Sequence, residues 1–401
     1  MREYDVVVFG ASGFTGRLVA EYLSQKKGEH RWAIAGRNAS KLEQVKKSLA
    51  ERYGVNVDVI LAEAFDVDAL RSMAARTKVV ASTVGPYMKY GSALVKSCVQ
   101  EATHYCDLTG ETPFIRETID LHHKQASENN CKIVHCCGFD SIPSDLGCWM
   151  IQKEAIDRQG APLDEVHFFM GPTKGGFSGG TVDSMLNIAA QVKSRSVRRV
   201  LAHPYSLNPK GFQKGPKVND APAPYFDSDL GRWTAPFVMA SINAKVVRRT
   251  QALTGQMYGS EFKYIEVMST KGWMMSMGIY VTLGMFFPLA AFGPTRWLMQ
   301  KTFLPKPGEG PSKEMRETGF FRAQLLGKRD GRVVLKGKVE GIQDPGYGET
   351  AKMLAESALA LAQDELPEKY GVLTPAVAIG ESLIQRLRAA GMTFEVLGDV
   401  A

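Results

Sequence analysis

Residues 6–16 read VVVFGASGFTG, an apolar run followed directly by three glycines spaced three positions apart. The β-branched and aromatic run at 6–9 predicts a buried strand, and RLVAEYLSQ after the last glycine has helical spacing. Such glycines allow a tight turn, close approach of the backbone to a pyrophosphate, and packing of helix on strand. We therefore expect the first unit of a dinucleotide-binding fold. The predicted cofactor loop consists of Gly10, Ser12, Gly13, Phe14, Thr15 and Gly16.

The end of the second predicted strand, at 32–35, carries the position that selects the cofactor. It lies about 20 residues beyond the glycine loop, where an acidic residue would bind the ribose 2′-hydroxyl of NAD. This chain instead has Gly36 and Arg37, with Lys41 on the next helix. A planar guanidinium suits a 2′-phosphate, so we expect NADP(H). A solvated surface arginine is the weaker alternative.

Two later strand ends extend the predicted cofactor site. Residues 57–61 form a third strand, after which Asp66 and Val67 are expected at the adenine ring. A fourth strand at 78–82 ends where ligands bind in open parallel sheets, beside the ribose and nicotinamide. The residues predicted there are Ser82, Thr83, Val84, Gly85 and Pro86. Further strands at 104–107 and 132–135, with helices at 92–100 and 112–129, complete a Rossmann-type, doubly wound parallel sheet of the α/β class.

After about residue 150 the pattern changes to that of a second α+β domain, over residues 151–347. Strands are expected at 164–170 and 261–268, and residues 316–341 alternate on both sides of Asp330-Gly331, which predicts a hairpin. A glycine-rich loop at 171–180 precedes a helix with Thr181 as its N-cap, and residues 202–236 read as a long loop. We expect this domain to bind substrate and to form a homodimer. Amphipathic helices between 348 and 390 should pack back on residues 1–150.

The stretch 272–295 has no charged residue and is long enough for a bilayer span. Its three glycines and two prolines argue against a straight span. We expect the segment 272–299 to be a helix with one face in the core. The other face would meet a lipid-like substrate, a membrane surface or a partner subunit.

Composition excludes several classes of function. The net charge of +7 is dispersed, which is not the footprint of a nucleic-acid-binding protein. All six cysteines lie between 98 and 148 without a CxxC pair, so we expect reduced, buried thiols and no metal site. The first residues enter a strand pattern without the features of a signal peptide. We expect a cytoplasmic protein, with a peripheral contact to a membrane or lipid droplet through 272–299.

Several motifs occur together: GASGFTG (10–16), AGR (35–37), STVGPY (82–87), YCDLTGE (105–111) and CCGFDSIPSDLG (136–147). With VVRRTQ (246–251) and LTPAVAIG (373–380), the whole chain resembles the saccharopine dehydrogenase-like oxidoreductases. The resemblance is to the short branch with a lipid-droplet-associated animal member and mycobacterial trans-acting enoyl reductases. It implies that Gly138 and Phe139 approach the nicotinamide.

Three residues are candidates for the catalytic site. Asp140 could orient substrate or relay a proton, or could be a helix cap. Tyr87 is a second candidate proton donor, or it packs on the cofactor. Thr181 is a third candidate. Asp107 and Glu111 are interpreted as acceptors that organise a loop rather than as an acid/base pair.

Three functions follow as hypotheses. The first is an NADPH-dependent reductase of a C=C (enoyl) bond in a lipid- or polyketide-like substrate, free or carrier-bound. The second is an imine or carbonyl reductase of saccharopine-reductase type, which would call for clustered Arg or Lys. The third is a lipid-surface nucleotide-binding protein with little turnover.

Overall fold

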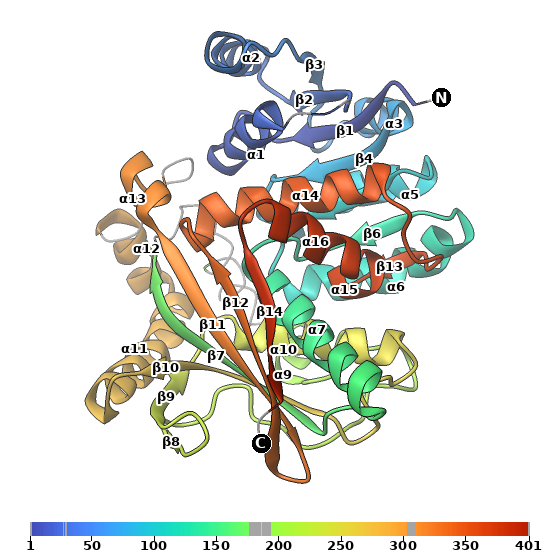
Figure 1. Ribbon diagram of the computed structural model, residues 1–401. Helices are drawn as coiled ribbons and strands as arrows, with labels where there is room; N and C mark the ends of the chain where they lie inside the picture. The colour runs from blue at the N-terminus through green and yellow to red at the C-terminus, as the bar shows by residue number, and fades with distance from the viewer. Residues whose placement is uncertain are drawn as a thin grey trace.

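The structure is a computed structural model that describes residues 2–26, 28, 30–175, 186, 194–302 and 310–399. Two seven-stranded sheets, each flanked by helices, make up the molecule (Figure 1). The predicted helix N-cap at Thr181 lies outside the described residues. The predicted α/β class, with a Rossmann-type sheet and a second α+β part, is confirmed.

The first sheet is parallel throughout, with strand order β13-β6-β5-β4-β1-β2-β3. Its strands are β1 (Tyr4–Phe9), β2 (Trp32–Gly36), β3 (Asp58–Leu61), β4 (Thr77–Ser82), β5 (His104–Asp107), β6 (Lys132–Val134) and β13 (Gly371–Leu373). The strand order reverses at β1 and β4, so the crevice between their carboxyl ends is the expected position of a dinucleotide.

Helices cover both faces of this sheet because its strands are apolar on both sides. Val6 and Val8 face a core formed with α1 (Phe14–Gln25), α2 (Ala39–Tyr53) and α14 (Thr350–Gln363). Val7 and Phe9 face the opposite core. The opposite core is built with α3 (Val67–Arg76), α5 (Ser92–Gln100) and α6 (Thr112–Glu128). All six cysteines are buried.

The second sheet is mixed, with order β14-β12-β11-β7-β10-β9-β8. Its strands are β7 (Glu165–Lys174), β8 (Phe226–Asp227), β9 (Arg232–Pro236), β10 (Lys263–Thr270), β11 (Phe320–Arg329), β12 (Arg332–Gly341) and β14 (Thr393–Asp399). The hairpin turns at Asp330 and Gly331, which both have positive φ, as predicted. The remaining helices are α4 (Tyr87–Tyr90), α7 (Ile142–Gln159), α9 (Arg195–Ala202), α10 (Ala240–Leu253), α12 (Gly293–Thr302), α13 (Lys313–Thr318), α15 (Pro375–Ala378), α16 (Glu381–Ala389) and a π-helical turn (Pro345–Glu349).

Several sequence predictions need correction. Helix α14 contacts β1, β4 and β5 of the first sheet, but it is buried along almost its whole length rather than amphipathic, because α1, α16 and the π-helical turn also pack on it. The segment 202–236 is not all loop, since β8 and β9 extend the second sheet. The short edge strands β13 and β14 were not expected, because three to seven residues carry little periodic signal.

The apolar stretch forms one continuous helix, α11 (Trp273–Ala291), which runs through Pro288. The stretch is thus helical, as expected, but the segment 272–299 is divided between α11 and α12. By length and composition, α11 is the one helix among the described residues that could span a membrane. Only 12% of its apolar window is buried inside the protein, so it is not a core helix. One such helix is weak evidence for a span.

Gly16 gives a test of the packing of α1 on β1. A Cβ there would lie 2.2 Å from the Gly10 carbonyl oxygen, whereas a Cβ on Gly278 in α11 would meet nothing within 4 Å. We expect Gly16→Ala to lower the free energy of unfolding by about 1–3 kcal/mol through overpacking. Gly278→Ala should raise it by roughly 0.5–1 kcal/mol through helix propensity. Urea denaturation measures both, and a Gly16→Ala variant as stable as wild type would contradict the packing.

Candidate active site

The glycine loop has the geometry of a phosphate cradle. Gly10 has φ +94°, and a Cβ there would come within 2.8 Å of both Thr83 and Val84. Helix α1 begins at Phe14 with Gly13 as N-cap and without a side-chain cap, so its first amides point at the loop. A pyrophosphate therefore fits against backbone that only glycine permits.

The end of β2 lies beside this loop. A Cβ on Gly36 would be 3.8 Å from the Ser12 hydroxyl, which places Arg37 next to the glycine turn. Arg37 is exposed and makes no hydrogen bond or ion pair with any described residue. Asn38 caps α2 through the Lys41 amide at 3.0 Å. The arrangement offers a free guanidinium and a helix N-terminus to a 2′-phosphate.

At the predicted adenine position, the Asp66 carboxylate caps α3 by accepting from the Ala69 amide at 3.0 Å. Asp66 and Val67 are exposed, and Phe65 is exposed and in ring contact with Tyr90. The structure therefore gives Asp66 a capping role through Oδ1, and its Oδ2 forms no hydrogen bond with the described part of the chain. Contact of Asp66 and Val67 with adenine stays a prediction.

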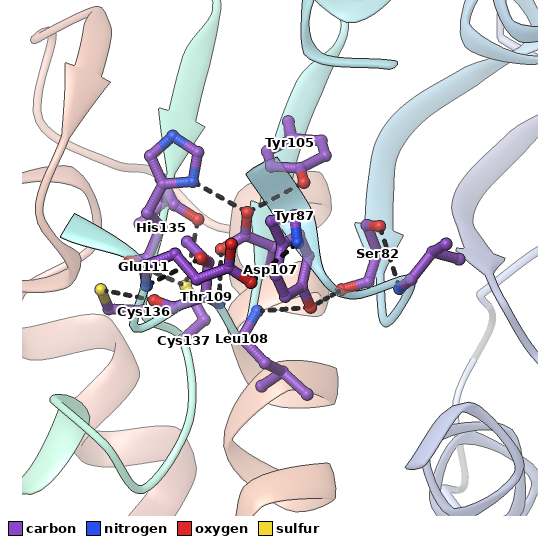
Figure 2. Close-up of polar contacts among 12 residues, drawn as sticks. Ser82, Tyr87, Tyr105, Asp107, Leu108, Thr109, Glu111, His135, Cys136 and Cys137 are labelled. Carbon is purple, nitrogen blue, oxygen red and sulfur yellow. Dashed lines mark hydrogen bonds and ion pairs between the residues drawn. The ribbon is translucent and has the colours of Figure 1, made fainter. Parts of the chain in front are cut away.

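A buried polar network holds the carboxyl ends of β4, β5 and β6 together (Figure 2). Asp107 accepts from the Tyr105 hydroxyl at 2.9 Å and the Thr109 amide at 3.0 Å, and its Oδ2 lies 2.8 Å from His135 Nδ1. Glu111 accepts from two successive backbone amides, those of Tyr87 and Met88. The interpretation of Asp107 and Glu111 as loop-organising acceptors is confirmed by these bonds.

Tyr87 belongs to this network rather than to a cavity. Its hydroxyl donates to the Ser82 carbonyl at 3.1 Å and accepts from the Leu108 amide at 3.3 Å (Figure 2). Burial raises the pKa of the Tyr87 phenol well above its ordinary value. The structure thus uses the hydroxyl to fix the strand ends, which disfavours the hypothesis that Tyr87 donates a proton to substrate.

A cavity of about 390 Å³ lies where the two sheets meet. Thr15 of the glycine loop lines it, as do Gly138, Phe139 and Asp140 at the start of α7. The structure thereby brings together the glycine loop and the predicted nicotinamide-proximal turn. The other described lining residues are Leu108, Met170, Thr173, Gly175, Phe237, Val238, Met239, Met268, Ile279, Leu283, Pro345, Gly346, Tyr347 and Thr350.

Asp140 carries the only carboxyl group among the described lining residues, which include no lysine, arginine or histidine. Burial raises the pKa of Asp140 to about 6. The alternative of a helix cap is wrong, because Ser141 is the N-cap of α7 and provides no side-chain cap. Asp140 therefore stays a candidate for proton exchange with a ligand in the cavity.

Two sets of contacts fix the turn that carries Asp140. Ser141 donates to the Asn243 side chain at 2.9 Å, and Asn243 donates to the buried Glu266 carboxylate at 2.7 Å. On the other side, the Phe139 amide donates to the Thr350 hydroxyl at 3.1 Å. Residues from α10, β10 and α14 thus position this turn.

The second half of the chain also reaches the glycine loop. The Phe14 ring meets Tyr347 edge to face at 5.0 Å, and the Arg316 guanidinium lies 5.6 Å from its centroid. Sequence reasoning missed Tyr347, Arg316 and the methionines of the cavity. The sequence indicates the methionines only through its general richness in Met, Phe and Gly. None of these residues forms a local motif, because they come together from elements far apart in the chain.

The comparisons with known proteins agree with this geometry. Residues 6–134 match the family described as saccharopine dehydrogenase NADP binding domain. A Mycobacterium tuberculosis protein named as a candidate trans-acting enoyl reductase is 39% identical, over 98% of this chain and 97% of the relative. Trans-acting enoyl reductases of Mycobacterium bovis and Mycobacterium leprae are 36% and 35% identical over the same shares.

A solved structure shows the fold over the whole chain. Saccharopine dehydrogenase (L-Glu forming) from Saccharomyces cerevisiae aligns over 99% of both chains, with a TM-score of 0.51 and 13% identity. Fold and loop together define an NADP-dependent oxidoreductase. The chain belongs to the saccharopine dehydrogenase-like family, in the group that contains the trans-acting enoyl reductases.

Arg37 gives a test of how the cofactor is selected. We expect Arg37→Asp to weaken NADPH binding by about ten- to a hundredfold through loss of a charge-assisted contact and added repulsion, and to change NADH binding little. Fluorescence titration with both nucleotides measures this. Lys124→Asp, on exposed α6 surface, is the matched charge-reversal control. An equal loss of affinity for the two nucleotides in Arg37→Asp would refute the assignment.

Proposed function

We propose that this NADPH-dependent oxidoreductase reduces the C=C bond of an enoyl group in a lipid- or polyketide-like substrate, free or carrier-bound. The observation that carries the proposal is the apolar cavity beside the glycine loop, with Asp140 as its only described carboxyl group. The names of the mycobacterial relatives support the same reaction.

The composition of the cavity argues against an amino-dicarboxylate substrate. Two or more carboxylates would require clustered cations, and the described lining residues provide none. Instead, Met170, Met239 and Met268 offer soft, adaptable apolar contacts. An imine reductase of saccharopine type is therefore the weaker alternative.

A bound NADPH would supply the hydride for the β-carbon of the enoyl group. The residues of the chain provide position, exclusion of water and a proton. The glycine loop and Arg37 hold the dinucleotide, while the apolar wall keeps the reacting carbon dry. Protonated Asp140 gives its proton to the α-carbon as the electron pair moves there, and solvent reprotonates the carboxylate afterwards.

Asp140→Asn tests the proton transfer. We expect kcat for enoyl reduction to fall by about 10²- to 10⁴-fold while NADPH affinity is retained. For wild type, kcat/KM should be constant below the pKa of about 6 and decline above it, because the acid must be protonated. The variant should lose this dependence on pH.

Asp157→Asn, at the exposed C-terminal end of α7, is the matched control and should keep wild-type kinetics. Reactions quenched at successive times over a range of pH, followed by product analysis, give kcat and kcat/KM. If Asp140→Asn turned over at the wild-type rate with an unchanged pH profile, Asp140 would not be the proton donor.

A substrate panel separates the candidate functions. We expect NADPH oxidation with enoyl thioesters of long acyl chains, and little with imines of amino-dicarboxylates or with small ketones. Preference for the imines would favour the saccharopine-type alternative. NADPH binding without turnover on any class would favour a nucleotide-binding protein at a lipid surface.

A further inference from the structure

Helices α11 and α12 display an apolar surface of unusual extent. Met274 is 82% exposed, and both tryptophans, Trp273 and Trp297, are at least half exposed. The other exposed apolar side chains of the surface are Met275, Tyr280, Val281, Met285, Leu289, Phe292 and Leu298. Contiguous apolar exposure of this kind marks an interaction site in a folded protein.

The charges within the segment that carries this surface have one sign. From Lys271 to Thr302 the chain has no Asp or Glu, and its cations are Lys271, Arg296 and Lys301. Lys301 lies over the Trp297 ring at 5.0 Å from its centroid. At the start of α11, Arg232 and exposed Phe226 share a surface hollow with Lys271. Apolar residues flanked by aromatics and cations match the boundary of an anionic bilayer.

We propose that α11 and α12 form a docking surface for an anionic lipid bilayer. The surface lies flat in the headgroup region, because the opposite side of α11 contacts the rest of the protein. Ser276 is buried and lies 2.6 Å from the Thr270 hydroxyl, while Ile279 and Leu283 line the cavity. At ~1.5 Å per residue α11 is roughly 28 Å long, so it covers several lipids when it lies in the plane.

A second copy of this chain is a poorer occupant. Isologous pairing of the surface would bring Lys271, Arg296 and Lys301 against the same cations, without a carboxylate from either segment to compensate. A bilayer supplies both the apolar depth and the negative charge. Because one helix forms both the docking surface and part of the cavity wall, a lipid-like ligand has a short path between them.

Co-sedimentation with vesicles tests this directly, without a substrate or turnover. The probes are vesicles of phosphatidylcholine alone and of phosphatidylcholine mixed with phosphatidylglycerol. Wild type should bind the mixed vesicles with a blue shift in tryptophan fluorescence. The double variant Met274→Glu/Met285→Glu should lose at least about tenfold in partition coefficient.

The matched control is Leu121→Glu/Leu397→Glu, which changes exposed leucines on α6 and β14 and should partition like wild type. Lys271→Glu/Lys301→Glu should remove most of the preference for phosphatidylglycerol, by about fivefold per charge. Retained NADPH binding shows that each variant is folded. If the methionine variant misfolds, the lysine variant still decides the outcome.

Three results would overturn the proposal. The first is wild-type protein that pellets no better with anionic vesicles than without them. The second is a control variant that loses as much binding as the methionine variant. The third is a dimer, seen by sizing, that the methionine variant dissociates, with no vesicle binding; this result would make a second copy the occupant. A failed enoyl-reductase assay leaves the vesicle result standing.

Discussion

The close approach of α1 to the end of β1 is the constraint on which the rest of this structure depends. The Gly10 carbonyl oxygen occupies the space that a Cβ on Gly16 would fill, so the helix can start immediately after the strand. Its free amides then face the crevice between β1 and β4. Thr15 lines the cavity from the start of this helix, and Arg37 follows the neighbouring strand beside the same glycine loop.

The second half of the molecule completes the site by closing over that edge. Residues from β7, β10, α11 and the π-helical turn contribute the apolar wall, and Phe14 packs on Tyr347 across the junction. Two buried networks keep the junction in register. The network around Asp107 and Glu111 fixes the strand ends, and the network around Glu266 fixes the first turn of α7. Both bury carboxylates that accept several hydrogen bonds, which offsets the cost of desolvating them.

The acidic groups of the site have different roles because their surroundings differ. Asp107 and Glu111 are surrounded by amides and hydroxyls and serve as fixed acceptors. Asp140 forms no hydrogen bond with any described residue, and burial raises the pKa of its carboxyl group to about 6, so it can hold a proton near neutral pH. Tyr87 is disfavoured as a proton donor, because its hydroxyl both donates to and accepts from the backbone inside the protein.

The sequence by itself determined the glycine loop, the NADP class of the cofactor, the strands of the first sheet up to residue 134 and the hairpin at Asp330-Gly331, because these depend on local backbone requirements and short periodic patterns. It also predicted a helix in the apolar stretch, but not the division of 272–299 between α11 and α12. Only the tertiary structure decided the cavity, the hydrogen bonds of the Tyr87 hydroxyl and the return of β13 and β14. These features depend on contacts between segments up to hundreds of residues apart. Such contacts produce no periodic pattern in the sequence of any single segment. The outward face of α11 belongs to the same category, since burial is a property of the packed chain and not of the helix alone.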